Sequence, residues 1–475
     1  MNDFVLSSRK WRLTCLGICQ MQHEGGKTMD FVVIGGDAAG MSAASRAKRN
    51  RPDIRVTVIE KTHDVSYSAC GMPYNIADPS RPMEDLVVRE ADAFRKQGIA
   101  VWTGHQATCI DRTAKTVSGR TSDGSSFSVS YDALLIATGA SPIVPDIPGL
   151  DLPGVMVLKH LEDGRRIKYF IRDADVKRAV IVGMGYIAME MCEALCERHI
   201  HVSMIKPGPG LLPWMDQQLS GVVQQELEAR GVALYPGVRI LGVEPVEKGL
   251  IVHGEGVDIE ADMIIVAVGV QPNSGIAVKA GLEIGPHQAI STDDRLRTSD
   301  PHIYAAGDCA DAVHAVTGQR VWIPLALRAN RAGWAVADNV CGKPVPLPGI
   351  VGTAVFRVLG LEVARTGLTV QEAETAGFQP VSGVIQSRSR AHAHPGASQI
   401  WVQMVADQKS GRLLGAQMVG REGAAHRINA VAVALHNRMT VEDFSRTDLA
   451  YAPPFGPVWD PLLTAANQLL KKIAQ

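Results

Sequence analysis

Runs of apolar residues alternate with polar turns along the chain and predict a repeated β-α-β unit. The first copy opens with an apolar strand at 30–34, passes through a glycine-rich turn into a helix at 41–50, and closes with a strand at 55–60. The polar turn 51–53 ends the helix. A short, continuous apolar run bounded by turn residues is typical of a strand that is buried on both faces of a parallel sheet.

The same design recurs later in the chain. A strand that begins at 178 leads through a Gly-x-Gly turn into a helix at 188–198 and a strand at 202–205. Each copy is followed by an apolar strand that ends on glycine, at 131–139 and at 261–269. The duplication predicts an α/β fold with two Rossmann-like units, which are the usual frame of a dinucleotide site.

The residues at the two turns indicate which nucleotides bind. The first turn runs from Gly35 to Gly40, and Asp37 replaces the middle glycine of the dinucleotide pattern. Glu60 follows about 20 positions later, where an acid accepts hydrogen bonds from ribose hydroxyls. The second unit has Lys206 in place of such an acid, which removes the repulsion toward a 2′-phosphate and offers a cation. We therefore expect NADPH, or both nicotinamide nucleotides, at the second site.

The C-terminal part of the chain predicts a separate α+β domain. A strand at 298–308 ends on glycine and aspartate, a long helix follows at 324–340, and the proline-rich linker 343–348 marks a boundary. Beyond it, the pattern predicts strands at 353–358, 382–386, 399–406 and 415–419 and helices at 369–376 and 424–437. The predicted domains are an extension without expected order (1–28), the first nucleotide unit in two parts (29–150 and 271–345), the inserted second unit (151–270) and the C-terminal domain (346–475).

Composition excludes several classes of function. A formal net charge of −1 over 475 residues gives no electrostatic reason to expect a nucleic-acid partner. No apolar run approaches the ~20 residues that span a bilayer. The cysteines are scattered without a disulfide framework, which in so long a chain indicates reduced thiols in the cytoplasm. Cys15, Cys19 and His23 lack further ligands, and we expect no metal site.

Cys70 is the candidate redox group. It lies in the stretch Val65-Ser-Tyr-Ser-Ala-Cys-Gly-Met-Pro-Tyr74, at a predicted helix start, where backbone N–H groups and the helix dipole favour a thiolate. Asn75 stands five positions further on, so Cys70 is not part of a Cys-x4-Cys pair. We infer that a redox-active Cys70 takes its sulfur partner from outside the chain.

Together the motifs resemble the single-cysteine flavoprotein disulfide reductases, and among them the coenzyme A-disulfide reductases. The resemblance rests on the order Gly-Gly-x-Ala-Ala-Gly, Ser-Tyr-x-x-Cys-Gly-x-Pro-Tyr, Ala-Thr-Gly, Gly-x-Gly-Tyr-Ile, Tyr-Ala-Ala-Gly-Asp and Tyr-Ala-Pro-Pro-Phe. It implies an FAD domain, an inserted NAD(P)H domain and a C-terminal domain that forms a homodimer with shared active sites. It also implies that Cys70 forms a mixed disulfide with coenzyme A.

The resemblance assigns ligands to individual positions. The implied FAD positions are Gly35, Gly36, Ala39, Gly40, Glu60, Lys61, Thr138, Gly139, Gly307 and Asp308. The implied nicotinamide nucleotide positions are Gly183, Gly185, Tyr186, Ile187, Glu190, Lys206 and Gly269. The implied coenzyme A positions are Ser42, Arg46, Arg49, Ser66, Asn330 and Trp459. Tyr451 would reach the active site of the partner subunit and protonate a departing thiolate, with His394 as a second candidate for that role.

The sequence also departs from the family in two places. Related water-forming oxidases and peroxidases carry a histidine in the first glycine loop, where this chain has Ala38, which argues against those activities. The family's Tyr-Tyr-Pro-Gly turn is replaced by Ala-His-Pro-Gly at 393–396. We expect NAD(P)H-dependent reduction of coenzyme A disulfide through Cys70. The alternatives are a persulfide or polysulfide reductase, an NAD(P)H oxidase, and a redox-sensing or electron-transfer flavoprotein.

Overall fold

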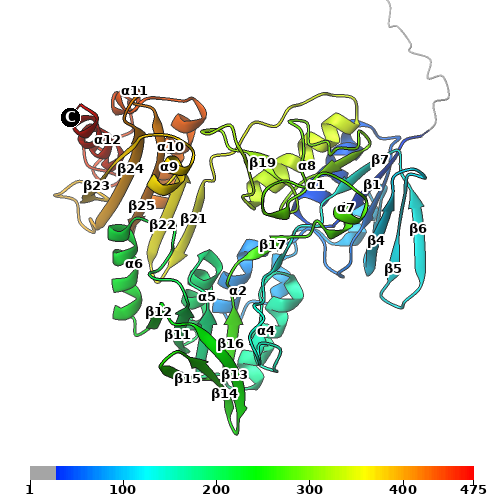
Figure 1. Ribbon diagram of the computed structural model, residues 1–475, viewed down its shortest axis with the longest axis horizontal. Coiled ribbons are helices and arrows are strands. Elements are labelled where there is room, and N and C mark those ends of the chain that lie inside the picture. The colour runs from blue at the N-terminus through cyan, green and yellow to red at the C-terminus, as the bar shows by residue number, and fades with distance from the viewer. Residues whose placement is uncertain (1–27, 475) are drawn as a thin grey trace, which may run out of the picture.

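The chain forms three sheet-based units at the corners of a triangle (Figure 1). The computed structural model describes residues 28–474, so the predicted extension, with Cys15, Cys19 and His23, lies outside the described residues. The first nucleotide unit and the C-terminal unit lie at the two upper corners of Figure 1, and the second nucleotide unit lies at the lower corner. Two Rossmann-like units followed by an α+β unit confirm the predicted fold class.

The first unit is built on a five-stranded parallel sheet with the order β18-β7-β1-β2-β3. Its strands are β1 (Asp30–Ile34), β2 (Arg55–Ile59), β3 (Ile99–Trp102), β7 (Ala133–Ile136) and β18 (Ile303–Ala305). Phe31 and Val33 pack with helices α1 (Ala38–Asn50) and α8 (Ala326–Val340). Val32 and Ile34 pack on the other face, with the antiparallel strands β4 (His105–Asp111), β5 (Thr116–Thr121) and β6 (Ser126–Ser130). Both faces of β1 are covered, which explains its uninterrupted apolar sequence.

The second unit repeats this topology, with the parallel order β12-β11-β10-β16-β9. Its strands are β9 (Val155–Met156), β10 (Arg178–Val182), β11 (His201–Lys206), β12 (Ala233–Pro236) and β16 (Met263–Val266). Its helices are α4 (Leu161–Asp173), α5 (Tyr186–Glu197) and α6 (Gln217–Ala229), and β13 (Ile240–Val246), β14 (Gly249–Gly254) and β15 (Val257–Ala261) form an antiparallel sheet. β10 lies between β11 and β16 as β1 lies between β2 and β7, which confirms the duplication.

Two short strands mark where the chain crosses between the units. β8 (Ala140–Pro142) leaves the first unit, β17 (Val270–Pro272) returns to it, and the two pair with each other in antiparallel fashion. The second unit is therefore an insertion in the first, as the sequence predicts. After the return, the first unit is completed by α7 (Gly275–Lys279), η3 (Pro286–Gln288), β19 (Ala312–Val313) and β20 (Arg320–Val321). α3 (Ala91–Arg95) precedes β3.

The C-terminal unit is an antiparallel sheet with the order β21-β22-β25-β24-β23, covered by helices. Its elements are β21 (Ala354–Val358), β22 (Leu361–Gly367), α9 (Val370–Thr375), β23 (Pro380–Arg388), β24 (Gln399–Asp407), β25 (Leu413–Gly420), α10 (Ala424–His436), α11 (Val441–Ser445) and α12 (Pro461–Ile473). The sequence analysis missed β22 and α12. α12 has clear start signals, because Asp460 caps it by accepting the N–H of Leu462 at 2.9 Å.

The segment around Cys70 belongs to the first unit by sequence but packs on the second. We call residues 64–88 the thiol loop; it contains η1 (Ala69–Gly71), α2 (Met72–Ala77) and η2 (Met83–Leu86). Met72, Ile76, Met83 and Leu86 are buried in the same apolar cluster as the inner faces of α4 and α5. The thiol loop is therefore held by apolar contacts that cross between the two nucleotide units.

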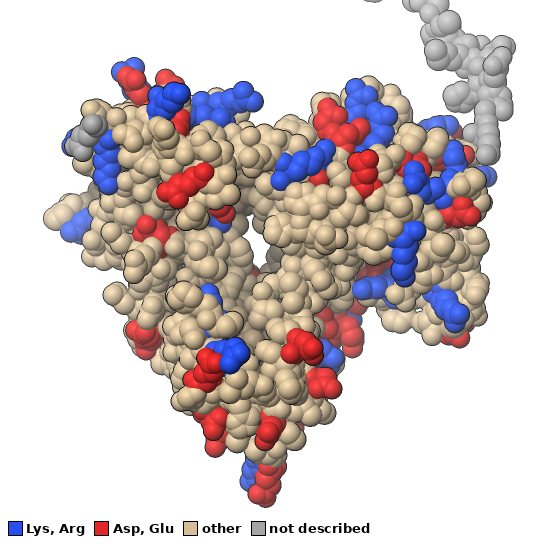
Figure 2. Space-filling model, viewed as in Figure 1, with Lys and Arg blue, Asp and Glu red and all other residues tan. Residues whose placement is uncertain are grey.

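The surface carries no large patch of one charge on the face shown in Figure 2, where basic and acidic side chains are interspersed. Within residues 28–474, no helix combines the length and the hydropathy needed to cross a bilayer. The same residues contain no group of three or more His, Cys, Asp or Glu side chains arranged to hold a metal ion.

Two mid-helix glycines should respond in opposite ways to alanine. A Cβ on Gly333 in α8 would lie 2.2 Å from the carbonyl oxygen of Ala39 in α1, whereas a Cβ on Gly221 in α6 would meet nothing within 4 Å. We expect Gly333→Ala to lower the free energy of unfolding by about 1–3 kcal/mol because α8 must move away. Gly221→Ala should raise it by about 0.5–1 kcal/mol through helix propensity. Denaturant unfolding measures both, and equal effects would contradict the close approach of α1 and α8.

Candidate active site

One large cavity lies where the two nucleotide units and the C-terminal unit meet. Its volume is about 2490 Å³, against roughly 300–1,000 Å³ for a pocket that holds one small ligand, so it has room for several ligands. The first glycine turn (35–39) and the second (183–187) both line it. Residues 66–70 of the thiol loop, 325–331 at the start of α8 and 347–356 at the start of the C-terminal unit also line it. We call this space the central cavity.

The first glycine turn fits a dinucleotide because its glycines have no side chains and its backbone packs closely against neighbouring carbonyl groups. Gly35 has a φ of +111°, and a Cβ there would lie 2.1 Å from the carbonyl oxygen of Ala137. A Cβ on Gly40 would lie 1.9 Å from the carbonyl oxygen of Gly35. Glu60 accepts the N–H of Gly36 at 2.7 Å and is almost fully buried, beside the turn where a ribose hydroxyl is expected.

Asp37 occupies the place of the missing glycine without backbone strain. Its φ is −112°, which any residue adopts, so the site does not demand glycine. Burial raises the pKa of its carboxyl to about 6, and the nearby carboxylates of Glu60 and Asp308 add to the rise, while Lys159 opposes it. The sequence analysis noted Asp37 as a departure, and the structure shows that it fits the turn as a weak acid.

The other predicted FAD residues surround the same space. Thr138 donates to the carbonyl oxygen of Asn273 at 2.6 Å, and the Asn273 side chain donates back to the Thr138 carbonyl oxygen at 2.8 Å, which ties the end of β7 to the chain returning from the second unit. Asp308 pairs with Lys159 at 3.0 Å. Lys61, Gly139 and Gly307 also line the central cavity. Sequence reasoning missed Asn273 and Lys159, because both act across long sequence separations.

The second glycine turn is similarly constrained. Gly183 has a φ of +120°, and a Cβ on it would lie 2.3 Å from the carbonyl oxygen of Ala267, while the space in front of Gly185 is open. Tyr186 stacks on Trp214 with ring centroids 5.2 Å apart and packs edge-on against Phe356 of β21, so its ring also joins the C-terminal unit. Ile187, Glu190, Lys206 and Gly269 line the cavity here.

Lys206 lies at the end of β11, as predicted. Burial lowers the pKa of its ammonium group, and none of the carboxylates in residues 28–474 forms an ion pair with it. Arg239 lines the same part of the cavity and pairs with Glu255 at 2.6 Å. Two cations therefore lie near the second glycine turn, and both would attract an anionic group of the nucleotide.

Cys70 lies in η1 and faces the central cavity, at the point where both units contribute walls. Burial raises the pKa of its thiol, and the carboxylates of Glu190 and Asp308 raise it further, whereas Lys159 opposes them. The raised pKa belongs to the chain without its nucleotides, so the sequence-based expectation that the helix start favours the thiolate stays a prediction.

Glu190 is held close to this thiol by Tyr74. The Tyr74 hydroxyl donates to Glu190 Oε1 at 2.9 Å, and burial raises the pKa of the Glu190 carboxyl despite that hydrogen bond. Glu190 comes from α5 behind the second glycine turn, whereas Tyr74 comes from α2 of the thiol loop. The pair connects the nicotinamide side of the cavity to the cysteine segment.

Some of the predicted coenzyme A residues line the central cavity and others do not. Ser42 donates to the side-chain oxygen of Asn330 at 2.7 Å, and Ser66, with a φ of +51°, lines the cavity near them. Arg46 forms two hydrogen bonds of 2.7 Å with Asp338 and lies over the ring of Trp334, so its charge is already paired. Arg49 is exposed. In this ligand-free arrangement Arg46 is engaged by Asp338, and the assignment of both arginines to coenzyme A stays a prediction.

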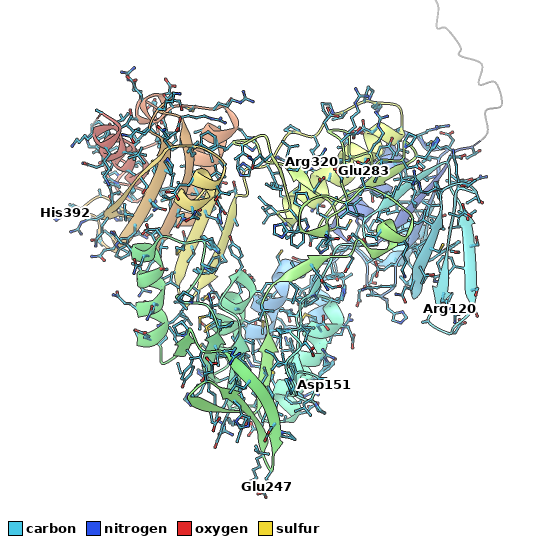
Figure 3. All side chains as sticks on the ribbon, viewed as in Figure 1. Arg120, Asp151, Glu247, Glu283, Arg320 and His392 are labelled. Atoms are coloured by element: carbon cyan, nitrogen blue, oxygen red, sulfur yellow. The ribbon has the colours of Figure 1, made fainter. Side chains whose placement is uncertain are left out.

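Three predicted residues lie away from the cavity of their own chain. Tyr451, His394 and Trp459 are absent from its lining, and the side chains of Tyr451 and Trp459 are largely exposed on the C-terminal unit. Figure 3 shows His392, two residues before His394, at the outer edge of that unit. His394 Nδ1 lies 3.0 Å from the carbonyl oxygen of Pro395. A role for Tyr451 at Cys70 therefore requires a second subunit.

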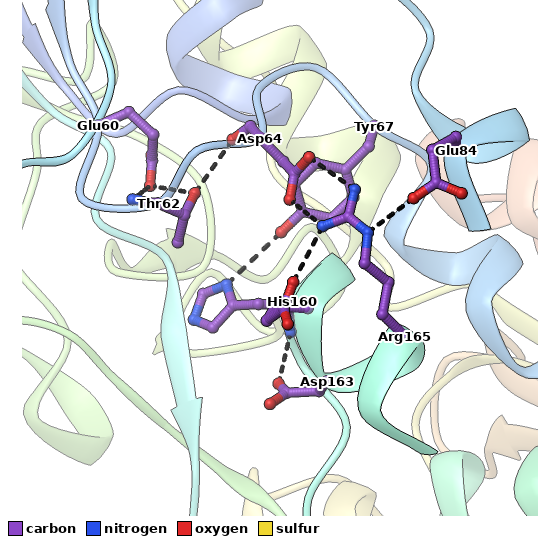
Figure 4. A network of polar contacts seen from close by, with 9 residues as sticks. Glu60, Thr62, Asp64, Tyr67, Glu84, His160, Asp163 and Arg165 are labelled. Atoms are coloured by element: carbon purple, nitrogen blue, oxygen red, sulfur yellow. Dashed lines mark hydrogen bonds and ion pairs between the residues drawn. The ribbon is translucent and has the colours of Figure 1, made fainter. Parts of the chain in front are cut away.

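A polar network joins α4 to the thiol loop, and sequence reasoning missed it. Figure 4 shows Arg165 between Asp64 and Glu84, and the Tyr67 hydroxyl 3.5 Å from Nδ1 of His160. These residues follow no motif and meet only because α4 packs on the loop. The signal available in the sequence is limited to the opposite charges, which are too common to identify partners.

The fold and this site combine two dinucleotide-type glycine turns with one cavity-lining cysteine among residues 28–474, Cys70. A family model described as pyridine nucleotide-disulphide oxidoreductase matches residues 29–333, and the model of its dimerisation domain matches residues 353–461. The chain belongs to the pyridine nucleotide-disulphide oxidoreductase family. It is an oxidoreductase that uses FAD and NAD(P)H.

Individual relatives show which members of this family the chain is similar to. The chain is similar to the CoA-dependent NAD(P)H sulfur oxidoreductase of Pyrococcus furiosus, with 39% identity over 440 residues that cover 92% of this chain and 98% of the relative. It is 28% identical to the coenzyme A disulfide reductase of Staphylococcus haemolyticus, over 90% of this chain and 96% of the relative. The solved structure of an NAD-dependent persulfide reductase from A. fulgidus aligns with a TM-score of 0.90 and 36% identity, over 94% of this chain and 83% of that chain.

The Asp37 carboxyl should make stability depend on pH. Because its pKa rises from 3.8 to about 6 on folding, the folded chain binds a proton more tightly, and the stability from this group is present below pH 4 and lost as pH rises through 6. We expect Asp37→Asn to stabilise the FAD-free protein by up to about 3 kcal/mol at pH 7.5, with no gain at pH 4. Denaturant midpoints across this range measure the effect, with Asp151→Asn as the exposed control. A gain that does not vary with pH would contradict the assignment.

Proposed function

We propose that this protein is an NAD(P)H-dependent flavoenzyme that reduces coenzyme A persulfide or polysulfide sulfur through a Cys70 mixed disulfide. The observation that carries the proposal is that Cys70 is the only cysteine of residues 28–474 that lines the central cavity. A lone thiol between two dinucleotide turns has no internal sulfur partner, so a small-molecule sulfur compound must supply one.

The choice of acceptor draws on the relatives. The sulfur oxidoreductase and the persulfide reductase are more similar to this chain than the coenzyme A disulfide reductase is. They favour the persulfide alternative over the coenzyme A disulfide that the sequence analysis places first. Coenzyme A disulfide is the second candidate, because its exchange at Cys70 uses the same thiol and the same leaving coenzyme A.

The reaction needs only ordinary thiol chemistry from the chain. Cys70 thiolate attacks the inner sulfur of the persulfide, forming a Cys70–S–S–CoA bond and releasing hydrosulfide. Bound FAD supplies two electrons taken from NAD(P)H. Their uptake by the mixed disulfide restores Cys70 and frees coenzyme A, so that NAD(P)H, one proton and the persulfide yield NAD(P)+, coenzyme A and hydrogen sulfide.

Other residues of the chain have supporting roles in this proposal. Gly35, Gly40, Glu60, Thr138 and Asp308 hold FAD, and Gly183, Gly185 and Glu190 hold the nicotinamide nucleotide. Ser42, Ser66 and Asn330 line the coenzyme A entry. The chain forms a homodimer through its dimerisation domain, which brings Tyr451 of the partner subunit to Cys70 as a proton donor. The domain boundaries that we propose are those given in the sequence analysis.

Replacing Cys70 tests the proposal directly. Cys70→Ser should abolish hydrogen sulfide release from coenzyme A persulfide, while FAD binding and NAD(P)H:ferricyanide activity persist, because neither needs the thiol. Cys109→Ser, at an exposed cysteine outside the cavity, is the control and should match the wild type. Intact mass of wild-type protein should show coenzyme A lost on reduction. Sulfur reduction by Cys70→Ser would refute the proposal, and faster turnover of coenzyme A disulfide would favour the second candidate.

The nucleotide preference depends on Lys206 in this proposal. Lys206→Glu should lower the ratio of kcat/KM for NADPH to that for NADH by about tenfold or more, or about 1.4 kcal/mol, because a carboxylate repels a 2′-phosphate. Lys177→Glu, at an exposed lysine outside the cavity, should leave the ratio unchanged. Steady-state kinetics with both nucleotides give the ratio. An unchanged ratio in Lys206→Glu would remove Lys206 from the nucleotide site.

A further inference from the structure

We propose that Arg165 is a positioning residue for Cys70, which closes the base of the thiol loop and fixes the sulfur in the central cavity. The inference rests on the proposed role of Cys70 as the redox thiol. Arg165 lies in α4, whose chain follows the crossing into the second unit, whereas the thiol loop belongs to the first. One side chain thereby connects the two units at the cysteine segment.

The guanidinium of Arg165 joins both arms of the thiol loop. Nη1 and Nη2 donate to the two oxygens of Asp64 at 2.7 and 2.9 Å, and Nε donates to Glu84 at 2.8 Å (Figure 4). Asp64 precedes Cys70 and Glu84 follows it. The side chains of Arg165 and Asp64 are each only 18% exposed, so their two-point contact is partly shielded from water. A planar fork that contacts two carboxylates fixes their separation more strictly than a flexible ammonium would.

The backbone at the loop base is too short to hold the arms alone. The N–H of Ser68 donates to Leu86 at 2.8 Å, the N–H of Val88 donates to Ser66 at 2.8 Å, and a single bridge lies between them. An isolated ladder of this length is marginal in water. The turn carrying Cys70 rests directly on this base, since a Cβ on Gly71 would lie 2.7 Å from the Leu86 side chain. Separation of the arms would therefore move Cys70.

α4 also holds the far end of the thiol loop. Lys168, three residues after Arg165 and on the same face, donates to Asn75 Oδ1 at 2.9 Å and to the Asp78 carbonyl oxygen at 2.8 Å. Lys159, just before α4, pairs with Asp308 at 3.0 Å. A single segment, 159–168, therefore contacts the loop on both sides of Cys70 and the acid expected to bind FAD. This arrangement sets the sulfur relative to the flavin position.

A matched pair of variants tests the inference in the FAD-loaded enzyme. Arg165→Met removes the bridge, and Arg166→Met removes a neighbouring arginine of α4 whose side chain is 55% exposed and lies 3.6 Å from Asp163. We expect Arg165→Met to lower kcat for coenzyme A persulfide on the order of 10- to 100-fold, since small displacements of a reacting group have effects of this size. The KM for NADPH and the ferricyanide activity should not change, and Arg165→Lys should recover part of the loss.

A second experiment measures the reactivity of the Cys70 thiol in the absence of turnover. The rate of Cys70 alkylation by iodoacetamide, followed by peptide mass across pH, should have a different pH midpoint in Arg165→Met and an unchanged one in Arg166→Met. Identical profiles and identical kcat in the two variants would overturn the inference. If Arg165→Met does not fold, Glu84→Gln removes one arm of the bridge at a largely exposed carboxylate, and a wild-type result there would equally overturn it.

The outcome also separates this inference from the proposed function. Persistent sulfur reduction in Cys70→Ser means that the proposed function is wrong, and the positioning role falls with it. Cys70-dependent turnover that is insensitive to both Arg165 and Glu84 means that only the positioning role is wrong.

Discussion

The packing of Met72, Ile76 and Leu86 against α4 and α5 holds the thiol loop, and with it Cys70, against the second nucleotide unit. These side chains are almost completely buried in the core of the second nucleotide unit, although the chain that carries them belongs to the first. Burial of each side chain contributes about 1.5–3 kcal/mol, which is enough to order a segment whose longest helix has six residues. With the apolar side of the loop fixed inward, Cys70 is left on the side that faces the central cavity.

The two glycine turns add a second constraint, because each allows no side chain between strand and helix. A Cβ on Gly35 or on Gly183 would lie within 2.3 Å of a carbonyl oxygen from the neighbouring strand. Both turns open on the same cavity, and the thiol loop passes between them. The crossing strands β8 and β17 and the Thr138–Asn273 bonds keep the two units in this relation. The two turns and Cys70 therefore share one cavity in a fixed arrangement.

The sequence was sufficient to predict the features that depend on the local pattern of residues. Several features lie where the hydrophobic periodicity and the motifs predict them, because each depends on residues that are close in the chain. They are the duplicated units, their glycine turns, Glu60, Lys206 and Cys70. The starts of the two helices after the glycine turns were placed two or three residues late, since the residues just after the glycines are already helical. β22 and α12 were missed, although Pro461 and Asp460 are ordinary start signals for the latter.

Features that depend on contacts between distant segments could not be predicted. Asn75 was read only as the place of an absent second cysteine, yet its buried amide donates to Pro82 and accepts from Lys168. Arg46 was assigned to coenzyme A from the family resemblance, and its partner Asp338 could not be foreseen because it lies on α8, which packs closely on α1. Partners of this kind become visible only when the tertiary contacts are known.

The charged groups around Cys70 influence the pKa of its thiol. Burial raises the pKa of the Asp37 carboxyl to about 6 and also raises the pKa of the Glu190 carboxyl, because the charged form of each is less well solvated there than in water. The same surroundings raise the pKa of Cys70, and Lys159 is the cation that opposes the effect. Exchange with a disulfide or persulfide requires the thiolate. The balance between Lys159 and the nearby acids therefore bears directly on how readily Cys70 loses its proton.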